Sequence, residues 1–153
     1  MTSKVKQRNI VVFLVFNFLV CLVVSIVLFK FSEKLDYSSI TTLDFNYNII
    51  TLAATMGGFL FTGVSILISA IDKNSIKNYW ENHYLDVLNY SAFLGIGLFM
   101  IVIIMALLSI FVKEVRCCEM FVKIQTVILL LGISNFGLSI KELIFVIKKI
   151  KNG

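Results

Sequence analysis

The sequence predicts an all-α integral membrane protein, a bundle of four transmembrane helices. Two observations carry this prediction. The chain of 153 residues is 59% hydrophobic and only 15% charged, whereas a soluble domain typically carries about 45–50% apolar and about 25% charged residues. The apolar residues also gather in four long runs, and a domain this small has no core that would bury all of them away from water. Lipid is therefore the expected solvent for these runs.

Each run is long enough to cross a bilayer as a helix. The runs cover residues 10–29, 49–71, 92–112 and 121–140, and a hydrocarbon core of about 30 Å takes about 20 helical residues. Only helices and closed barrels satisfy backbone hydrogen bonds in lipid, and these runs lack the alternating pattern of barrel strands. The whole chain, residues 1–153, is expected to form a single membrane domain.

The connections between the runs differ in character. Residues 113–120 form a short link, which makes the third and fourth helices antiparallel neighbours. Residues 30–48 are rich in Ser, Thr, Asp and Asn, and the stretch 38–42 offers caps for a short helix or for an early start of the second helix. Residues 72–91 place apolar and aromatic side chains at helical spacing, which predicts an amphipathic helix on the cytoplasmic surface. The tail, residues 141–153, is expected to continue the fourth helix as a basic extension.

The net charge of +5 is concentrated at the ends of the apolar runs. Four spans place both termini and residues 72–91 on one side, and that side holds nine of the 14 Lys and Arg residues. The positive-inside rule therefore predicts a multi-pass protein with both termini in the cytoplasm. The same charges favour contact with membrane lipids through anionic headgroups. Nucleic acid is not an expected partner, because no basic stripe is interleaved with aromatic residues.

The sequence shows no pattern typical of catalysis or metal binding, so we expect no enzyme activity, cofactor or metal. His83 is the single histidine, and no Cys/His cluster has metal-ligand spacing. Cys117 and Cys118 are adjacent, and a disulfide between neighbours is strained, whereas a thiol oxidoreductase needs a spaced pair. The run 10–29 also lacks the membrane-embedded glutamate of the small four-helix multidrug exporters.

A continuous stripe of small and polar residues runs along the second predicted helix. Its members follow one another at spacings of three and four, which places them on one helix face: Asn48, Thr51, Thr55, Gly58, Thr62, Ser65 and Ser69. One interpretation is close packing, in which small residues let backbones approach and hydroxyls bond across the seam. The other is a water-lined path, formed when several copies place the stripe around one axis. The sequence leaves both interpretations open.

Polar residues also occur inside the first and fourth runs. The amides Asn17, Gln125 and Asn135 are unfavourable in lipid and are expected to face protein or water, most simply as hydrogen bonds between helices. Gln125 and Asn135 belong to a thinner stripe that also contains Ile128, Gly132, Ser139 and Glu142. In the cytoplasmic connection, four residues are the candidate contacts with a protein partner: Tyr79, Trp80, His83 and Tyr84.

In size, hairpin layout and a Gly- and Thr-rich second helix, LAATMGGFLFTGVSILIS, the chain resembles small four-helix membrane proteins of bacteria. These include membrane subunits encoded beside phage-defence genes and immunity proteins for membrane-active toxins. Together with the stripe, the resemblance leads to two hypotheses. The first is a homo-oligomeric protein of the inner membrane that perturbs or conducts across the bilayer, as an effector in defence against phage. The second is a partner-binding immunity or accessory subunit without a pore. A purely structural protein, in which every stripe is a packing seam, is the third possibility.

Overall fold

The computed structural model describes residues 2–31, 42–69 and 85–151, and in these ranges every regular element is a helix. The elements are α1 (Thr2–Phe31), α3 (Leu43–Ser69), α5 (Asp86–Phe111), the single turn α6 (Lys113–Arg116) and α7 (Glu119–Lys151). Four of these helices are long and apolar enough to span a membrane. The predicted all-α chain with four helices of transmembrane length is therefore confirmed.

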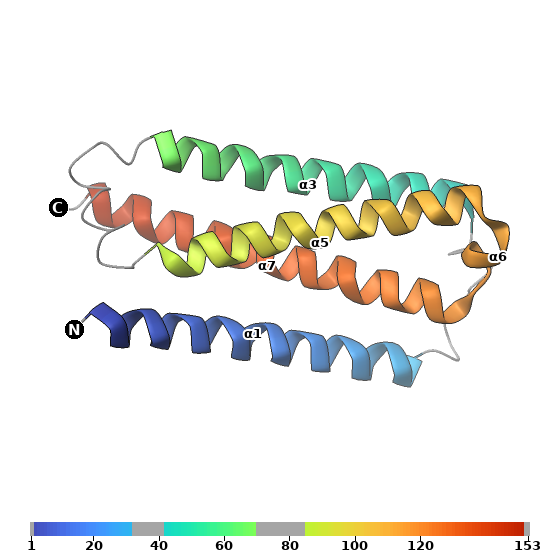
Figure 1. Ribbon diagram of the computed structural model, residues 1–153, viewed down its shortest axis with the longest axis horizontal. Coiled ribbons are helices and arrows are strands. Elements are labelled where there is room, and N and C mark those ends of the chain that lie inside the picture. The colour runs from blue at the N-terminus through green and yellow to red at the C-terminus, as the bar shows by residue number, and fades with distance from the viewer. Residues whose placement is uncertain (1, 32–41, 70–84, 152–153) are drawn as a thin grey trace.

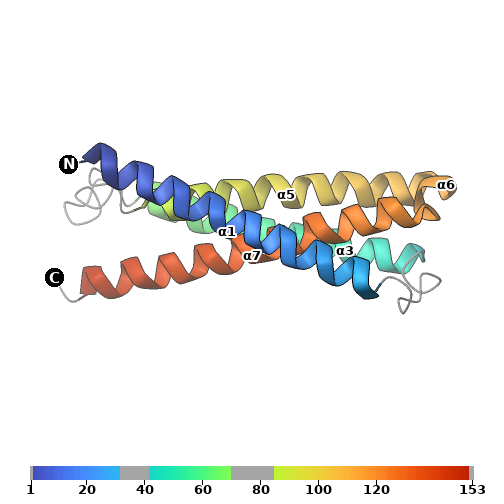
Figure 2. The same ribbon diagram turned by 90° about the horizontal axis from the view of Figure 1, so that it is seen from below.

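The four long helices run up and down beside one another (Figure 1). α5 is the central helix of a three-helix core, because it packs extensively against both α3 and α7, whereas α3 and α7 share few contacts. α1 lies outside this core and crosses α7 at an angle (Figure 2). α1 begins and α7 ends at the same end of the bundle (Figure 1).

The core consists of apolar side chains on the facing sides of α3 and α5, and small residues let α5 and α7 approach closely. A Cβ added to Gly132 would lie 2.8 Å from the ring of Phe99, and one added to Gly95 would lie 2.8 Å from the end of the Leu60 side chain. Phe99 itself is only 1% exposed, so its ring has little room to move. Close approach at small residues is the usual way in which membrane helices gain contact energy.

The helices extend beyond the apolar runs that predict them. α3 begins at Leu43, where the Thr42 hydroxyl accepts a hydrogen bond from the Phe45 amide at 3.2 Å and so caps an early start. α5 begins at Asp86 rather than at residue 92, because Leu88 already packs into the core. α7 continues without a break to Lys151. The thickness of a bilayer determines the length of an apolar run. Backbone hydrogen bonds do not depend on side-chain polarity, so a helix can continue beyond the end of that run.

The predicted amphipathic segment 72–91 is described only in part. Residues 86–91 form the first turns of α5, so this portion continues into the third of the four long helices instead of forming a separate helix. Residues 72–84 lie outside the described residues. The four candidate partner contacts lie there as well: Tyr79, Trp80, His83 and Tyr84.

The link between α5 and α7 is short, and the two helices are antiparallel neighbours. Val112 leaves the helical conformation, with φ −120° and ψ 106°, and the single turn α6 follows. Glu119 then begins α7 and forms an ion pair with Lys123 one turn later. A long cationic side chain at this level can reach the headgroup region. Cys117 and Cys118 are free and exposed in this link.

Candidate functional site

The polar stripe of α7 faces the interior of the bundle. Gly132 and Ser139 are buried, Gln125 is 2% exposed and Asn135 is fully buried. Their spacings of seven, three and four residues put them on one helix face. Buried polar groups in apolar surroundings are expected to form hydrogen bonds, and the side chains of Gln125, Asn135 and Ser139 each have a partner on another helix.

Asn135 connects α7 to α1. Its Nδ2 donates to Asn17 Oδ1 at 2.7 Å and to the Leu131 carbonyl at 2.9 Å, while Asn17 Nδ2 donates to the Phe13 carbonyl at 3.0 Å. Phe13 is the one buried residue among the side chains of α1 that the structure describes. Its ring lies 6.0 Å from that of Tyr90 of α5. Among the described side chains, one amide pair and one aromatic ring contact link α1 to the core.

The same stripe connects α7 to α5 and α3. The hydroxyls of Ser139 and Ser91 lie 2.8 Å apart, and both residues are buried. Gln125 Nε2 lies 3.5 Å from Asn46 Oδ1, which is at the long limit of a hydrogen bond. Sequence reasoning missed Asn46 and Ser91 because both lie outside the apolar runs. The sequence pattern that could have identified them is their spacing: Asn46 lies three residues before Ile49 and Ser91 lies three residues after Leu88, so each is on the buried face of its helix.

The α3 stripe, in contrast, faces away from the bundle. The core-facing residues of α3 are Asn46, Ile49, Ala53, Leu60 and Val64. The stripe lies about two positions further along the chain, and two positions correspond to about 200° on a helix with 3.6 residues per turn. All seven members are accordingly exposed in the single chain: Asn48, Thr51, Thr55, Gly58, Thr62, Ser65 and Ser69. The stripe is therefore not a seam between the described helices of its own chain.

Most hydroxyls of the α3 stripe bond to their own helix. Thr51 donates to the Tyr47 carbonyl at 3.0 Å, and Thr55 donates to the Thr51 carbonyl at 2.7 Å. Ser65 and Ser69 make equivalent bonds to backbone carbonyls of α3, each of 2.8 Å. Because the hydroxyl hydrogen is used, the oxygen lone pairs remain free to accept. The stripe thus presents neutral acceptor oxygens and small side chains, and none of its seven members is charged.

The α3 stripe is as long as a bilayer is thick. From Asn48 to Ser69 it measures roughly 32 Å at 1.5 Å per residue, and a hydrocarbon core is about 30 Å thick. Large apolar side chains flank it on both sides and are themselves exposed: Leu52, Phe59, Phe61 and Ile66. The polar α3 stripe is therefore suited to contact with protein or water, and its apolar flanks are suited to contact with lipid.

Two clefts open on the half of the bundle where α1 begins and α7 ends. The first, about 350 Å³, lies between α3, α5 and α7, and Ser139 is the single polar residue among those that line it. The second, about 470 Å³, lies between α1, α5 and α7 and has Lys141 and Glu142 among its lining residues. Within the described ranges, no group of three or more His, Cys, Asp or Glu side chains is arranged to hold a metal ion.

Comparison of the chain with protein-family models, with curated proteins and with solved structures finds no match. The functional inference therefore rests on the geometry of the chain itself: an inward polar stripe on α7, an outward polar stripe on α3, and a peripheral α1.

Proposed function

We propose that the chain is a homo-oligomeric membrane protein that conducts across, or otherwise perturbs, the bilayer. The observation that carries the proposal is the outward α3 stripe, which is small and polar over the full thickness of the hydrocarbon core. In a single chain this face meets lipid, which gains nothing from its exposed acceptor oxygens. In an oligomer the stripes face one another around a shared axis, where those oxygens contact water or neighbouring helices.

The chemistry of the stripe favours passive permeation. Transporters driven by ions or protons generally place ionisable side chains inside the membrane, and the stripe contains none. Hydroxyl oxygens such as those of Thr55 and Thr62 replace part of the hydration shell of a small ion without binding it tightly. We therefore expect a weakly selective path for water and small ions rather than a coupled transport cycle.

Electrical recording from the purified full chain tests this function. We expect conductance in planar bilayers from wild type and its loss when Thr55→Leu and Thr62→Leu are combined, because two leucines per copy make the middle of the path apolar. Phe61→Leu is the matched control, since Phe61 is exposed on the flank of the same helix. Silent wild-type bilayers under every voltage and lipid composition tried would count against conduction. Unchanged conductance in the double variant would show that the stripe does not line the conducting path.

We extend the proposal to a role as a membrane effector in bacterial defence against phage, on the strength of the resemblance in size and layout described above. The expected phenotype is membrane depolarisation of a bacterial host that expresses the chain, triggered by infection and reported by a voltage-sensitive dye. Depolarisation is expected to be lost in the Thr55→Leu, Thr62→Leu variant. A host whose membrane potential and phage titre are the same with and without the chain would contradict this role.

A second candidate, a partner-binding immunity or accessory subunit without a pore, is favoured by one observation. The stripe hydroxyls already bond to carbonyls of their own helix, which suits them to dry packing against a helix of another protein. Disulfide crosslinking from Thr62→Cys in the native membrane discriminates, in a chain whose three free cysteines, Cys21, Cys117 and Cys118, are replaced by serine. A product of twice the chain mass supports self-association, and a product with another protein supports the accessory role. A pull-down with Trp80→Ala tests the cytoplasmic contact separately.

We also propose that both termini lie in the cytoplasm of a cell whose inner membrane holds the chain. The observation is the excess of Lys and Arg on that side of the four spans, read with the positive-inside rule. Cys117 and Cys118 are exposed at the opposite end of the bundle. A membrane-impermeant maleimide is therefore expected to label intact cells at these residues. Labelling only after the cells are opened would indicate the reverse orientation.

A further inference from the structure

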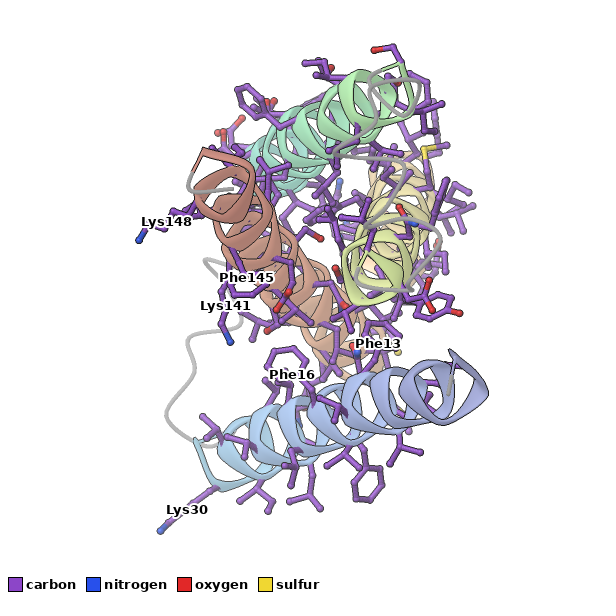
Figure 3. All side chains as sticks on the ribbon, turned by 90° about the vertical axis from the view of Figure 1, so that its left-hand side faces the viewer. Phe13, Phe16, Lys30, Lys141, Phe145 and Lys148 are labelled. Atoms are coloured by element: carbon purple, nitrogen blue, oxygen red, sulfur yellow. The ribbon has the colours of Figure 1, made fainter. Side chains whose placement is uncertain are left out.

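The cleft between α1 and α7 has the form of a binding site for a single lipid chain. One wall comes from α1 and includes Phe13 and Phe16, the other comes from α7 and includes Gly137 and Leu138, and Val87 of α5 closes it. Figure 3 shows Phe13 and Phe16 projecting from α1 toward the rest of the bundle. The volume of about 470 Å³ falls within the range of about 300–1,000 Å³ that ligand clefts occupy.

The depth of the cleft matches one leaflet of a bilayer. Asn17, which bonds to Asn135, lies near the middle of the apolar part of α1, Ile10–Val27. From Asn135 to Lys141 is about 9 Å along the helix, and the long lysine side chain adds further reach toward the headgroups. The cleft thus extends from about the bilayer midplane to the interface.

Two opposite charges lie at the mouth of this cleft. Lys141 is exposed, Glu142 is half-buried, and both line the cleft. Among the described residues neither forms an ion pair, whereas Lys123 at the other end of α7 pairs with Glu119. Figure 3 shows Lys141 projecting from α7 on the side toward α1. A neighbouring ammonium and carboxylate that have no ion-pair partner in the described part of the chain are complementary to a zwitterion, since the ammonium attracts a phosphate and the carboxylate attracts an amine.

We propose that the α1–α7 cleft binds one phospholipid with a primary-amine headgroup, of the phosphatidylethanolamine class. An acyl chain fills the apolar part between Phe16 and Gly137. Lys141 binds the phosphate, and Glu142 accepts hydrogen bonds from the ammonium group. A choline headgroup has no N–H to donate, and an anionic glycerol headgroup has no positive charge to place against Glu142. The site belongs to one chain, so it does not depend on the proposed oligomer.

Native mass spectrometry of the full chain tests the proposal. The protein is equilibrated in detergent with equal amounts of phosphatidylethanolamine, phosphatidylcholine and phosphatidylglycerol that share the same acyl chains. We expect one retained lipid per chain, with the ethanolamine lipid preferred over the choline lipid by about fivefold, which corresponds to the net contribution of about one hydrogen bond from the ammonium group. Excess free phosphoethanolamine is not expected to displace it, because the acyl chain contributes most of the binding.

Single substitutions separate the role of the Glu142 carboxylate from that of the Lys141 ammonium group in lipid binding. Glu142→Gln is expected to lower the ethanolamine-to-choline ratio, because an amide oxygen accepts a weaker hydrogen bond from the ammonium group than a carboxylate does. Lys141→Gln is expected to weaken retention of all three lipids by about fivefold. Glu114→Gln, an exposed acid in α6 at the other end of the bundle, is the matched control and should change nothing.

Filling the cleft tests the chain contact. A Cβ at Gly137 meets nothing within 4 Å, so Gly137→Leu occupies the cleft without a backbone clash and is expected to abolish retention. Gly97→Leu, also exposed and open, is the control on the outer surface. Equal retention of the three lipids by wild type, or an ethanolamine preference that is undiminished in Glu142→Gln, would overturn the proposal. The first readout uses wild type and the second uses a polar substitution at the mouth of the cleft, so both stand even if Gly137→Leu folds poorly.

Discussion

Replacing Gly58 by leucine separates association between copies from folding of the single chain. Gly58 lies in the middle of the α3 stripe, is exposed, and would place a Cβ with no atom within 4 Å. Within one chain Gly58→Leu is therefore expected to be tolerated, and the helix gains about 0.8–1 kcal/mol because glycine is a poor helix former. In a ring of copies whose stripes face one axis, a small residue such as Gly58 lets neighbouring helices approach closely, and a leucine there would hold their backbones apart.

The expected effect on association follows from this geometry. Forcing extra methylene groups into a packed interface costs about 1–3 kcal/mol, which corresponds to a dissociation constant raised by about fivefold to about 150-fold. Energy transfer between donor- and acceptor-labelled chains in liposomes, measured as the lipid-to-protein ratio increases, gives this constant directly. The curve for Gly58→Leu should shift to higher protein density.

The matched control is Gly97→Leu on α5. Gly97 is also exposed and also has open space around a Cβ, but it lies outside the α3 stripe. If Gly58→Leu associates as wild type does, or if Gly97→Leu weakens association equally, the stripe is not the contact between copies and the reasoning from its outward position fails.

Three further predictions concern the fold. Gly132→Ala should lower the free energy of unfolding by about 1–3 kcal/mol, because its Cβ would meet the buried Phe99 ring; unfolding in denaturing detergent measures this. Asn17→Leu should weaken the attachment of α1 by about 0.6–2 kcal/mol through loss of the bond from Asn135, measured as faster hydrogen exchange in α1. Gln125→Leu should cost less than about 0.6 kcal/mol, because its contact to α3 is long, and the same unfolding assay applies.

The controls for these three variants use the same helices. Gly137→Ala adds the same methyl group to α7 in open space and should raise the unfolding free energy by up to about 1 kcal/mol, because alanine is the better helix former. A double-mutant cycle of Asn17→Leu with Asn135→Leu isolates the amide pair. Additive effects in that cycle would show that the pair does not hold α1, and equal costs for Gly132→Ala and Gly137→Ala would refute the packing argument.

The existence of four helices of membrane-spanning length was predictable because lipid leaves few choices. A run such as 92–112 must be helical if it is in a bilayer, whatever it packs against. The helix ends were less predictable, since α5 begins at Asp86 and α7 reaches Lys151. Those ends depend on packing of single residues such as Leu88, and hydropathy does not report such contacts.

The two polar stripes show that residue spacing alone does not decide whether a helix face is buried or exposed. On α3 and on α7, small and polar residues recur at the same spacing, and packing within the chain is the simplest interpretation of either. In the structure Asn135 is fully buried and bonded to another helix, whereas Thr55 is exposed. Spacing places residues on one face of a helix, but the rotation of that helix about its axis is set by the large side chains on the remaining faces. On α3 those are Ile49 and Leu60, which occupy the core.

The stoichiometry of the full chain in a bilayer tests the central claim most directly. Single chains carrying one fluorophore each, reconstituted at low density in liposomes, lose fluorescence in discrete photobleaching steps that count the copies in a complex. An outward stripe that spans the hydrocarbon core predicts complexes of three or more copies, because one or two helices do not enclose water. A population of single chains, unchanged as protein density rises, would contradict the account.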